Sequence, residues 1–367
     1  MLATSASKAS VLVRSQNSVN DGHIITVLGA GASAQCGFPL ADDFFPRIRA
    51  FGESLGENSL RLKQVIDYVV TKAGELDCLT PDDFALRMYQ TRPGENRDVT
   101  INVLYYARIV TDAFFLHIER QAATSTMRAF KDYWHEVVGN YSQSWGGGFP
   151  STRHRLVTFN YDRIAELSFV RHFPQIASNG MDLYGPGMLN TGFSSWRNAL
   201  QFGDGFCYLK LHGTVGAMPL GRNEVGATFG DRFVHYASGL ADQSPEITDN
   251  LYFEPGGNGL PKRQLTPLVA FPVDKQHVES GGEEYNFKDY IDAVGGKARE
   301  IFPQADRIEI IGYSFRAPDK KWLVSLLLTA PEARKLVINP QAKRICEELE
   351  HRDGVINLVP IERRWGE

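Results

Sequence analysis

Short apolar runs alternate along much of the chain with segments of helical periodicity. Six runs have the length and composition of buried β-strands, at 24–28, 155–159, 207–211, 268–271, 307–311 and 335–338. Stretches with apolar residues three and four apart separate several of them, at about 161–172, 286–301 and 319–330. This alternation predicts an α/β fold in which helices cover both faces of a parallel sheet.

Four further helical segments follow the first predicted strand, at 42–51, 60–72, 81–89 and 99–138. Pro81, followed by Asp82 and Asp83, has the features of a helix start, because proline fits the first turn and acids favour the positive end of the helix dipole. We therefore expect a helical insertion at about 42–150.

The expected domain organisation is a flexible tail over residues 1–20 and one domain over 21–367. Within that domain, the glycine-rich region at about 216–262 lacks strong periodicity and predicts a long loop.

Composition restricts the class of protein. The 367 residues are 43% hydrophobic and 22% charged, which is typical of a globular chain with a large core. The formal net charge of −4 provides no global basic surface, so we expect no direct nucleic-acid binding, although a local basic patch is compatible with it. We find no apolar run long enough to cross a membrane and no leader-peptide pattern, and a cytoplasmic location is expected.

The four cysteines lie far apart in the sequence and form none of the closely spaced pairs that a structural zinc site usually needs. A reduced compartment fits this cysteine usage, and no metal site is predicted. The cysteines are Cys36, Cys78, Cys207 and Cys346.

The run 24–28 leads directly into a loop of small residues, Gly29 to Gly37. Gly29 and Gly31 permit a tight turn and a close backbone approach, and a helix that follows would present N–H groups to a phosphate. A plain turn between a strand and a helix would have the same small residues. The loop alone is therefore weak evidence for dinucleotide binding.

Polar residues follow three of the predicted strands, at the edge where ligands bind in parallel sheets. They are Asn160 and Asp162 after the second strand, His212 after the third, and Ser314 after the fifth. Each also has a structural explanation: Asn160 and Asp162 could cap a helix, His212 could be a satisfied core histidine, and Ser314 could be a turn residue. Their joint placement with the glycine loop favours a ligand-binding site at this edge of the sheet.

Together these motifs resemble the sirtuin fold, and more closely the SIR2-like NAD-hydrolysing domains of bacterial antiphage defence systems. The resemblance spans about residues 22–345 and rests on five motifs in the family's order: Gly29-Ala-Gly-Ala-Ser33 with Gly37-Phe-Pro39, Thr158-Phe-Asn-Tyr-Asp162, Leu211-His-Gly213, Gly312-Tyr-Ser314 and Val337-Ile-Asn339. It implies a Rossmann-like parallel sheet of sirtuin type. The chain departs from sirtuin deacylases because it lacks their four-cysteine zinc module, and because Leu40, Ala41 and Asp42 follow the Gly-Phe-Pro segment.

The resemblance implies that NAD is the substrate and that no cofactor is needed. Asn160 would orient water or the ribose, Asp162 would hold the nicotinamide carboxamide, and His212 would be the base. The remaining positions would bind the rest of NAD, with Ser314 and Asn339 on the adenosine side; this binding set is Gly29, Ala30, Gly31, Ala32, Ser33, Phe38, Gly312, Ser314 and Asn339. Asn339 has a nearly equal structural explanation, as a capping or turn residue before Pro340.

The activity implied by the resemblance is NAD hydrolysis with release of nicotinamide, by an effector that depletes cellular NAD during phage infection. The resemblance also implies a homo-oligomer and a separate ATPase or nucleic-acid sensor subunit as partner. Two alternatives stay open: an NAD-dependent protein deacylase, disfavoured by the missing zinc module, and a non-catalytic module that binds NAD or ADP-ribose, disfavoured by the presence of both Asn160 and His212.

Overall fold

The computed structural model describes ten stretches of the chain. They are residues 22–90, 97–138, 154–172, 193–195, 207–219, 232–235, 246–253, 267–271, 287–315 and 319–367. The predicted N-terminal tail lies outside them.

A six-stranded sheet organises these stretches, with every neighbouring pair of strands parallel. In spatial order its strands are β4 (Cys207–Lys210), β2 (His154–Thr158), β1 (His23–Leu28), β7 (Ala305–Ile311), β8 (Arg334–Ile338) and β9 (Leu358–Ile361). The chain builds outward from β1 on one side and then returns to build outward on the other, in the Rossmann order 3-2-1-4-5-6. The predicted α/β class and parallel sheet are confirmed.

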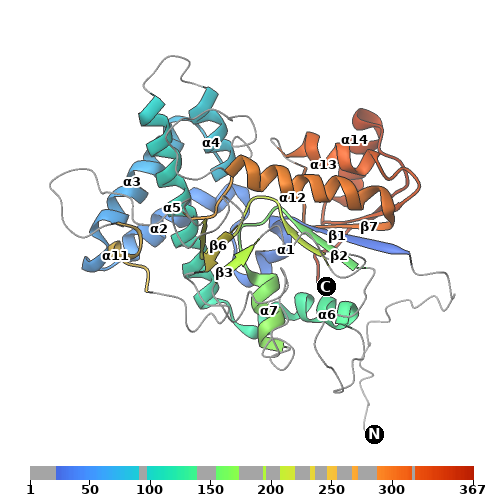
Figure 1. Ribbon diagram of the computed structural model, residues 1–367, viewed down its shortest axis with the longest axis horizontal. Helices are drawn as coiled ribbons and strands as arrows, with labels where there is room; N and C mark the ends of the chain where they lie inside the picture. The colour runs from blue at the N-terminus through green and yellow to red at the C-terminus, as the bar shows by residue number, and fades with distance from the viewer. Residues whose placement is uncertain are drawn as a thin grey trace, which may run out of the picture.

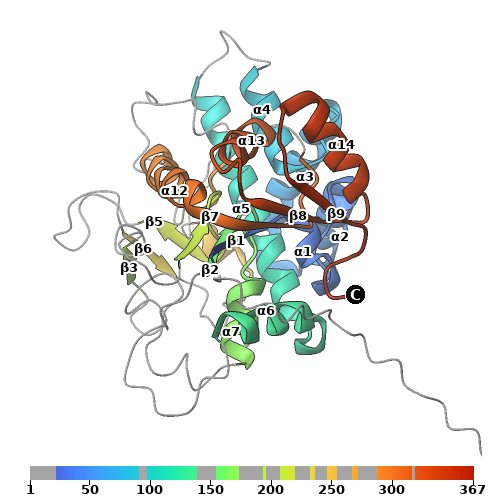
Figure 2. The ribbon, with the colours of Figure 1, turned by 90° about the vertical axis from the view of Figure 1, so that its right-hand side faces the viewer.

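Helices cover both faces of this sheet (Figures 1 and 2). On one face lie α12 (Phe287–Ile301), α13 (Lys320–Leu328) and α14 (Ala342–Asp353), whose buried side chains join Ile25 and Val27 of β1 in one core cluster. On the other face lie α6 (Arg128–Val138) and α7 (Ile164–His172), in the cluster that contains Leu28. Alternate residues of a strand point to opposite faces, which explains why one strand supplies both clusters.

The described part of the segment between β1 and β2 is mostly helical, with short turns between the helices. After the short α1 (Ala30–Ser33), its helices are α2 (Phe44–Ser54), α3 (Leu60–Glu75), α4 (Pro81–Gln90), α5 (Arg97–Gln121) and α6. α2 to α5 form a block beside the sheet (Figure 1), with an aromatic core in which Phe44 packs edge-on against Phe114. None of the described helices is long and apolar enough to span a bilayer.

Two segments differ from expectation. Leu268–Phe271 was predicted as a strand of the main sheet, but this buried run lies antiparallel to the loop after β4, where Val269 bridges Gly213. The region 216–262, predicted as a loop, contains β5 (Ala217–Pro219), β6 (Arg232–His235) and α11 (Asp249–Tyr252) among its described residues. β5 and β6 pair in a small antiparallel sheet with β3 (Phe193–Ser195).

The loops that follow β1 and β7 meet backbone to backbone. A Cβ on Gly312 would lie 2.3 Å from the Ala32 nitrogen, and Gly312 has a φ of +63°. We expect Gly312→Ala to lower the free energy of unfolding by about 3 kcal/mol, because it adds both a steric overlap and a left-handed alanine. Urea denaturation measures this.

Gly296→Ala in α12 is the matched control, since a Cβ there meets nothing within 4 Å. Alanine in a helix interior should keep stability unchanged or raise it by about 0.5–1 kcal/mol. Equal stabilities for the two variants would contradict the close approach at Gly312.

Candidate functional site

The glycine loop after β1 is held by its own backbone and by the loop after β7. The Gly29 N–H donates to the Ile311 carbonyl, the Gly31 N–H to the Gly312 carbonyl and the Ala32 N–H to the Gly29 carbonyl, each at 2.9 Å. A Cβ on Gly31 would lie 2.9 Å from the Gly312 Cα. The sequence predicted that the N–H groups here would cradle a phosphate, but these three have partners within the protein. Close packing of two loops therefore explains the glycines at least in part, while Ala30 is exposed.

Asn160 connects the end of β2 to this loop. Its Nδ2 donates to the Gly29 carbonyl at 3.0 Å and to the Ser33 Oγ at 3.3 Å. Its own backbone N–H donates to the Thr158 Oγ1 at 3.0 Å, which fixes the turn after the strand. Asn160 is thus a bracing residue for the glycine loop as well as a polar group at the carboxyl edge of the sheet.

Asp162 adjoins the same cluster, because the Ser33 side chain is close enough to its carboxyl to oppose the rise of its pKa. The Asp162 Oδ1 also accepts the Ile164 N–H at 3.1 Å, at the start of α7, so the capping role weighed from the sequence is present. Burial raises the pKa of the Asp162 carboxyl to about 6, and the nearby Lys210 ammonium opposes that rise. The Lys210 ammonium itself bonds the Asp162 carbonyl and pairs with Glu166 at 3.0 Å.

His212 forms the centre of an adjoining cluster. It is 1% exposed and lies between two rings, with centroids 5.5 Å from those of both Phe159 and Tyr161. Its Nε2 lies 3.1 Å from the Asp319 Oδ1, while its Nδ1 is buried without a hydrogen-bond partner. The antiparallel run holds this loop in place, because the Ala270 N–H donates to the His212 carbonyl at 2.8 Å.

Asp82 completes this cluster from α4, in the helical insertion. It accepts a hydrogen bond of 2.5 Å from the Tyr161 hydroxyl. Burial raises the pKa of the Asp82 carboxyl to about 6; Asp319 adds to this rise, and His212 and the Tyr161 hydrogen bond oppose it.

Asp82, His212 and Asp319 bring three ligand atoms within 4.8 Å of one another, so they are the group that could hold a metal ion within the described stretches. Hydrogen bonds to Tyr161 and between His212 and Asp319 already account for the placement of all three. The absence of a metal stays a prediction.

Neither acid was identified from the sequence as a site residue. The sequence predicts a helix start at Asp82, which the structure confirms, and it does not single out Asp319. The usable signal at Asp319 was its position directly before a helix, seven residues after Gly312 in a segment that follows a strand. The signal at Asp82 was absent, because only the packing of α4 brings it to His212.

The other predicted binding residues are dispersed. The Asn339 Nδ2 donates to the Tyr313 carbonyl at 3.3 Å, and its Oδ1 accepts the Gln341 N–H at 2.9 Å, so it has the turn role weighed from the sequence. Ser314 is exposed beside these loops. Phe38 is buried and packs edge-on against Phe115 of α5, at 5.1 Å, as a member of the helical core rather than of the clusters around Asn160 and His212.

Buried polar groups of α5 hold the loops that carry both clusters. Glu119 accepts the Arg163 backbone N–H at 2.7 Å and pairs with the Arg163 guanidinium at 2.7 Å. Asp112 accepts the Gly216 N–H at 2.7 Å, in the loop that follows His212. Arg108 donates to the Val269 carbonyl at 2.9 Å. The insertion is therefore part of the support of the site.

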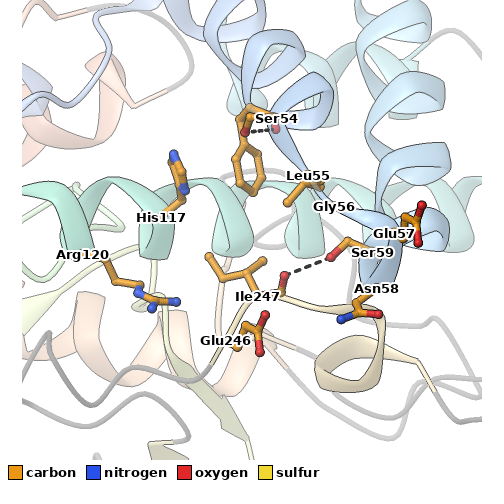
Figure 3. Close-up of a pocket in the computed structure, with 11 residues that line it drawn as sticks. Ser54, Leu55, Gly56, Glu57, Asn58, Ser59, His117, Arg120, Glu246 and Ile247 are labelled. Carbon is orange, nitrogen blue, oxygen red and sulfur yellow. Dashed lines mark hydrogen bonds between the residues drawn. The ribbon is translucent and has the colours of Figure 1, made fainter.

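A separate pocket of about 440 Å³ lies between α2, the turn that precedes α3, α5 and the segment before α11 (Figure 3). His117, Arg120 and Glu246 contribute polar groups to it, and the Ser59 hydroxyl donates to the Ile247 carbonyl at its edge. It contains none of the predicted site residues.

Comparison with known proteins yields structural matches only. No family model and no curated protein matches the chain. The solved structures that match include two point mutants of a Sir2 homologue, each in complex with ADP-ribose. Each aligns with 14% identity and a TM-score of 0.40, over 94% of this chain and 87% of its own.

The raised pKa of Asp82 predicts a pH-dependent effect on stability. A carboxyl whose pKa rises from 3.8 when unfolded to about 6 when folded holds its proton better in the folded protein, so it lowers stability as the pH rises through that interval. Asp82→Asn removes this loss. The free energy of unfolding of the variant, relative to that of wild type, should rise by about 1–3 kcal/mol between pH 4 and pH 7.5, as measured by urea denaturation at both pH values.

Asp83→Asn is the matched control, since it removes an acid from the same helical turn without touching the His212 cluster. The difference in the free energy of unfolding between Asp83→Asn and wild type should change less with pH than the difference for Asp82→Asn. If the difference in the free energy of unfolding between Asp82→Asn and wild type did not change with pH, this would contradict the raised pKa of the Asp82 carboxyl.

Proposed function

We propose that the chain is an NAD⁺ hydrolase that releases nicotinamide. The observation that carries the proposal is the position of Asn160, whose amide braces the glycine loop at the carboxyl ends of β1 and β2, next to the His212 cluster. In sheets of this strand order, dinucleotides bind in the crevice where the order reverses, here between β1 and β7. The sequence resemblance to sirtuin-like NAD-hydrolysing domains supports the same substrate.

Hydrolysis of NAD requires few catalytic groups from the protein. Nicotinamide leaves as a neutral molecule when its bond to ribose C1′ breaks, so no acid must protonate it, unlike in ordinary glycoside hydrolysis. The site must stabilise an oxocarbenium-like ribose and activate water. Asn160 orients the water or the ribose, His212 accepts the proton, and Asp162 binds the carboxamide.

The rest of NAD extends along the switch point. In the proposal, the exposed start of the loop at Ala30 and the Ser33 hydroxyl face the pyrophosphate, and Ser314 and Asn339 lie toward the adenosine. NAD is consumed in this reaction, so it is the substrate and no further cofactor is proposed.

An enzyme that depletes NAD must be restrained in its host, so we propose that it acts as an antiphage effector that a trigger releases. The proposed assembly is a homo-oligomer with a separate ATPase or nucleic-acid sensor subunit. The block α2 to α5 is the candidate contact surface, because the same block carries Asp82, Asp112 and Glu119 to the site loops.

The test is nicotinamide release from NAD by the purified protein, alone and with the product of its genomic neighbour, with and without an acetylated peptide. We expect release without peptide. His212→Ala should lower kcat by about 10²–10⁴-fold, the usual contribution of a positioned proton acceptor. Asn160→Ala should lower kcat by about 10²-fold, because it removes the group that orients the water or the ribose.

His172→Ala provides the matched control. His172 lies in α7 and bonds the Ser168 carbonyl, away from both clusters, and its loss should leave release unchanged. Strict dependence on the peptide would indicate a deacylase, and NAD binding without turnover under every condition would indicate a binding module. Full activity of either site variant would refute the assigned residues.

A further inference from the structure

The contact between His212 and Asp319 indicates which nitrogen of the imidazole accepts the proton in the proposed reaction. We infer that Asp319 is a positioning residue that holds His212 in the tautomer with the proton on Nε2, so that Nδ1 is the atom that accepts the proton. The role in catalysis rests on the proposed function, while the tautomer does not.

The assignment follows from donors and acceptors. An ionised carboxylate can only accept hydrogen bonds, so the 3.1 Å contact between the Asp319 Oδ1 and the His212 Nε2 needs a proton on Nε2. A neutral imidazole carries one N–H, which leaves a lone pair on Nδ1.

The burial of Nδ1 points to a role for this lone pair. It is buried without a partner, an arrangement that lowers stability and is uncommon in folded proteins. A water molecule or a ribose hydroxyl of the substrate would supply the missing donor.

Asp319 is placed for this role by the helix that follows it. It is the N-cap residue of α13, where its carbonyl accepts the Leu323 N–H at 3.0 Å. Its side chain makes no capping hydrogen bond to that helix, although aspartate is a preferred cap. The carboxylate is directed to His212 instead, and both side chains are at least nine-tenths buried.

The protonated imidazole would be flanked by two acids. Asp319 faces it from the start of α13 and Asp82 from α4, and the rings of Phe159 and Tyr161 enclose it. In the step, a water O–H bond breaks as the proton moves to Nδ1. The water oxygen bonds to ribose C1′, and the electron pair of the C–N bond departs with neutral nicotinamide.

Long-range ¹H–¹⁵N NMR of histidine-labelled protein tests the tautomer directly. The His212 signals are assigned by their loss in His212→Gln. We expect a protonated Nε2 and an unprotonated Nδ1 in wild type. In Asp319→Asn this tautomer should no longer be fixed, because an amide can either donate or accept.

Kinetics test the positioning role. Asp319→Asn should lower kcat by about 10²–10⁴-fold with little change in KM, and Asp319→Glu should restore part of the loss by returning a carboxylate. Asp353→Asn is the control; it removes the partner of Lys320 at the start of the same helix, at 2.8 Å, and does not contact His212.

Three results would overturn the inference: a proton on Nδ1 in wild type, an unchanged kcat in Asp319→Asn, or a stoichiometric Zn²⁺ that wild type retains and both Asp82→Asn and Asp319→Asn lose. The first and third need no enzyme activity. They therefore separate failure of this inference from failure of the proposed hydrolase.

Discussion

The close approach of the loops after β1 and β7 is the constraint on which the site depends. Gly31 and Gly312 contact through their backbones, which fixes the carboxyl ends of the two central strands relative to each other. Asn160 then braces the same loop from β2, and Asn339 reaches the Tyr313 carbonyl from the end of β8. Four strand ends are thereby tied into one rigid edge, where a ligand of this fold class would bind.

The helical insertion helps to hold the loops at this edge of the sheet in place. α5 places carboxylates and a guanidinium, all buried, against backbone groups of three separate loops, and α4 supplies an acid beside His212. Burying polar groups in this way lowers stability unless each group is paired. A small shift of α5 relative to the sheet would therefore disturb every loop that α5 holds. The insertion and the sheet therefore constitute one mechanical unit.

The sequence predicted the sheet well because strands that are buried on both faces are largely apolar, as at 24–28. It failed at Leu268–Phe271, where an equally apolar run pairs antiparallel with the His212 loop, because composition does not reveal a strand's neighbour. It also indicated Asn160, Asp162 and His212 as polar groups at strand ends. Asp82 could not be found in this way, since its contact with Tyr161 spans 79 residues and arises from tertiary packing alone.

The parallel pairing of β1 with β7 also affects the order of events during synthesis. The start of β1 contacts residues that lie 283 positions later in the chain, as the hydrogen bond between His23 and Asp306 illustrates. Asp319 is synthesised later still. Contacts of such long sequence separation form slowly and cannot form on a ribosome-bound chain that still lacks β7. A nascent chain thus cannot assemble the complete constellation around His212 until Asp319 has emerged from the ribosome.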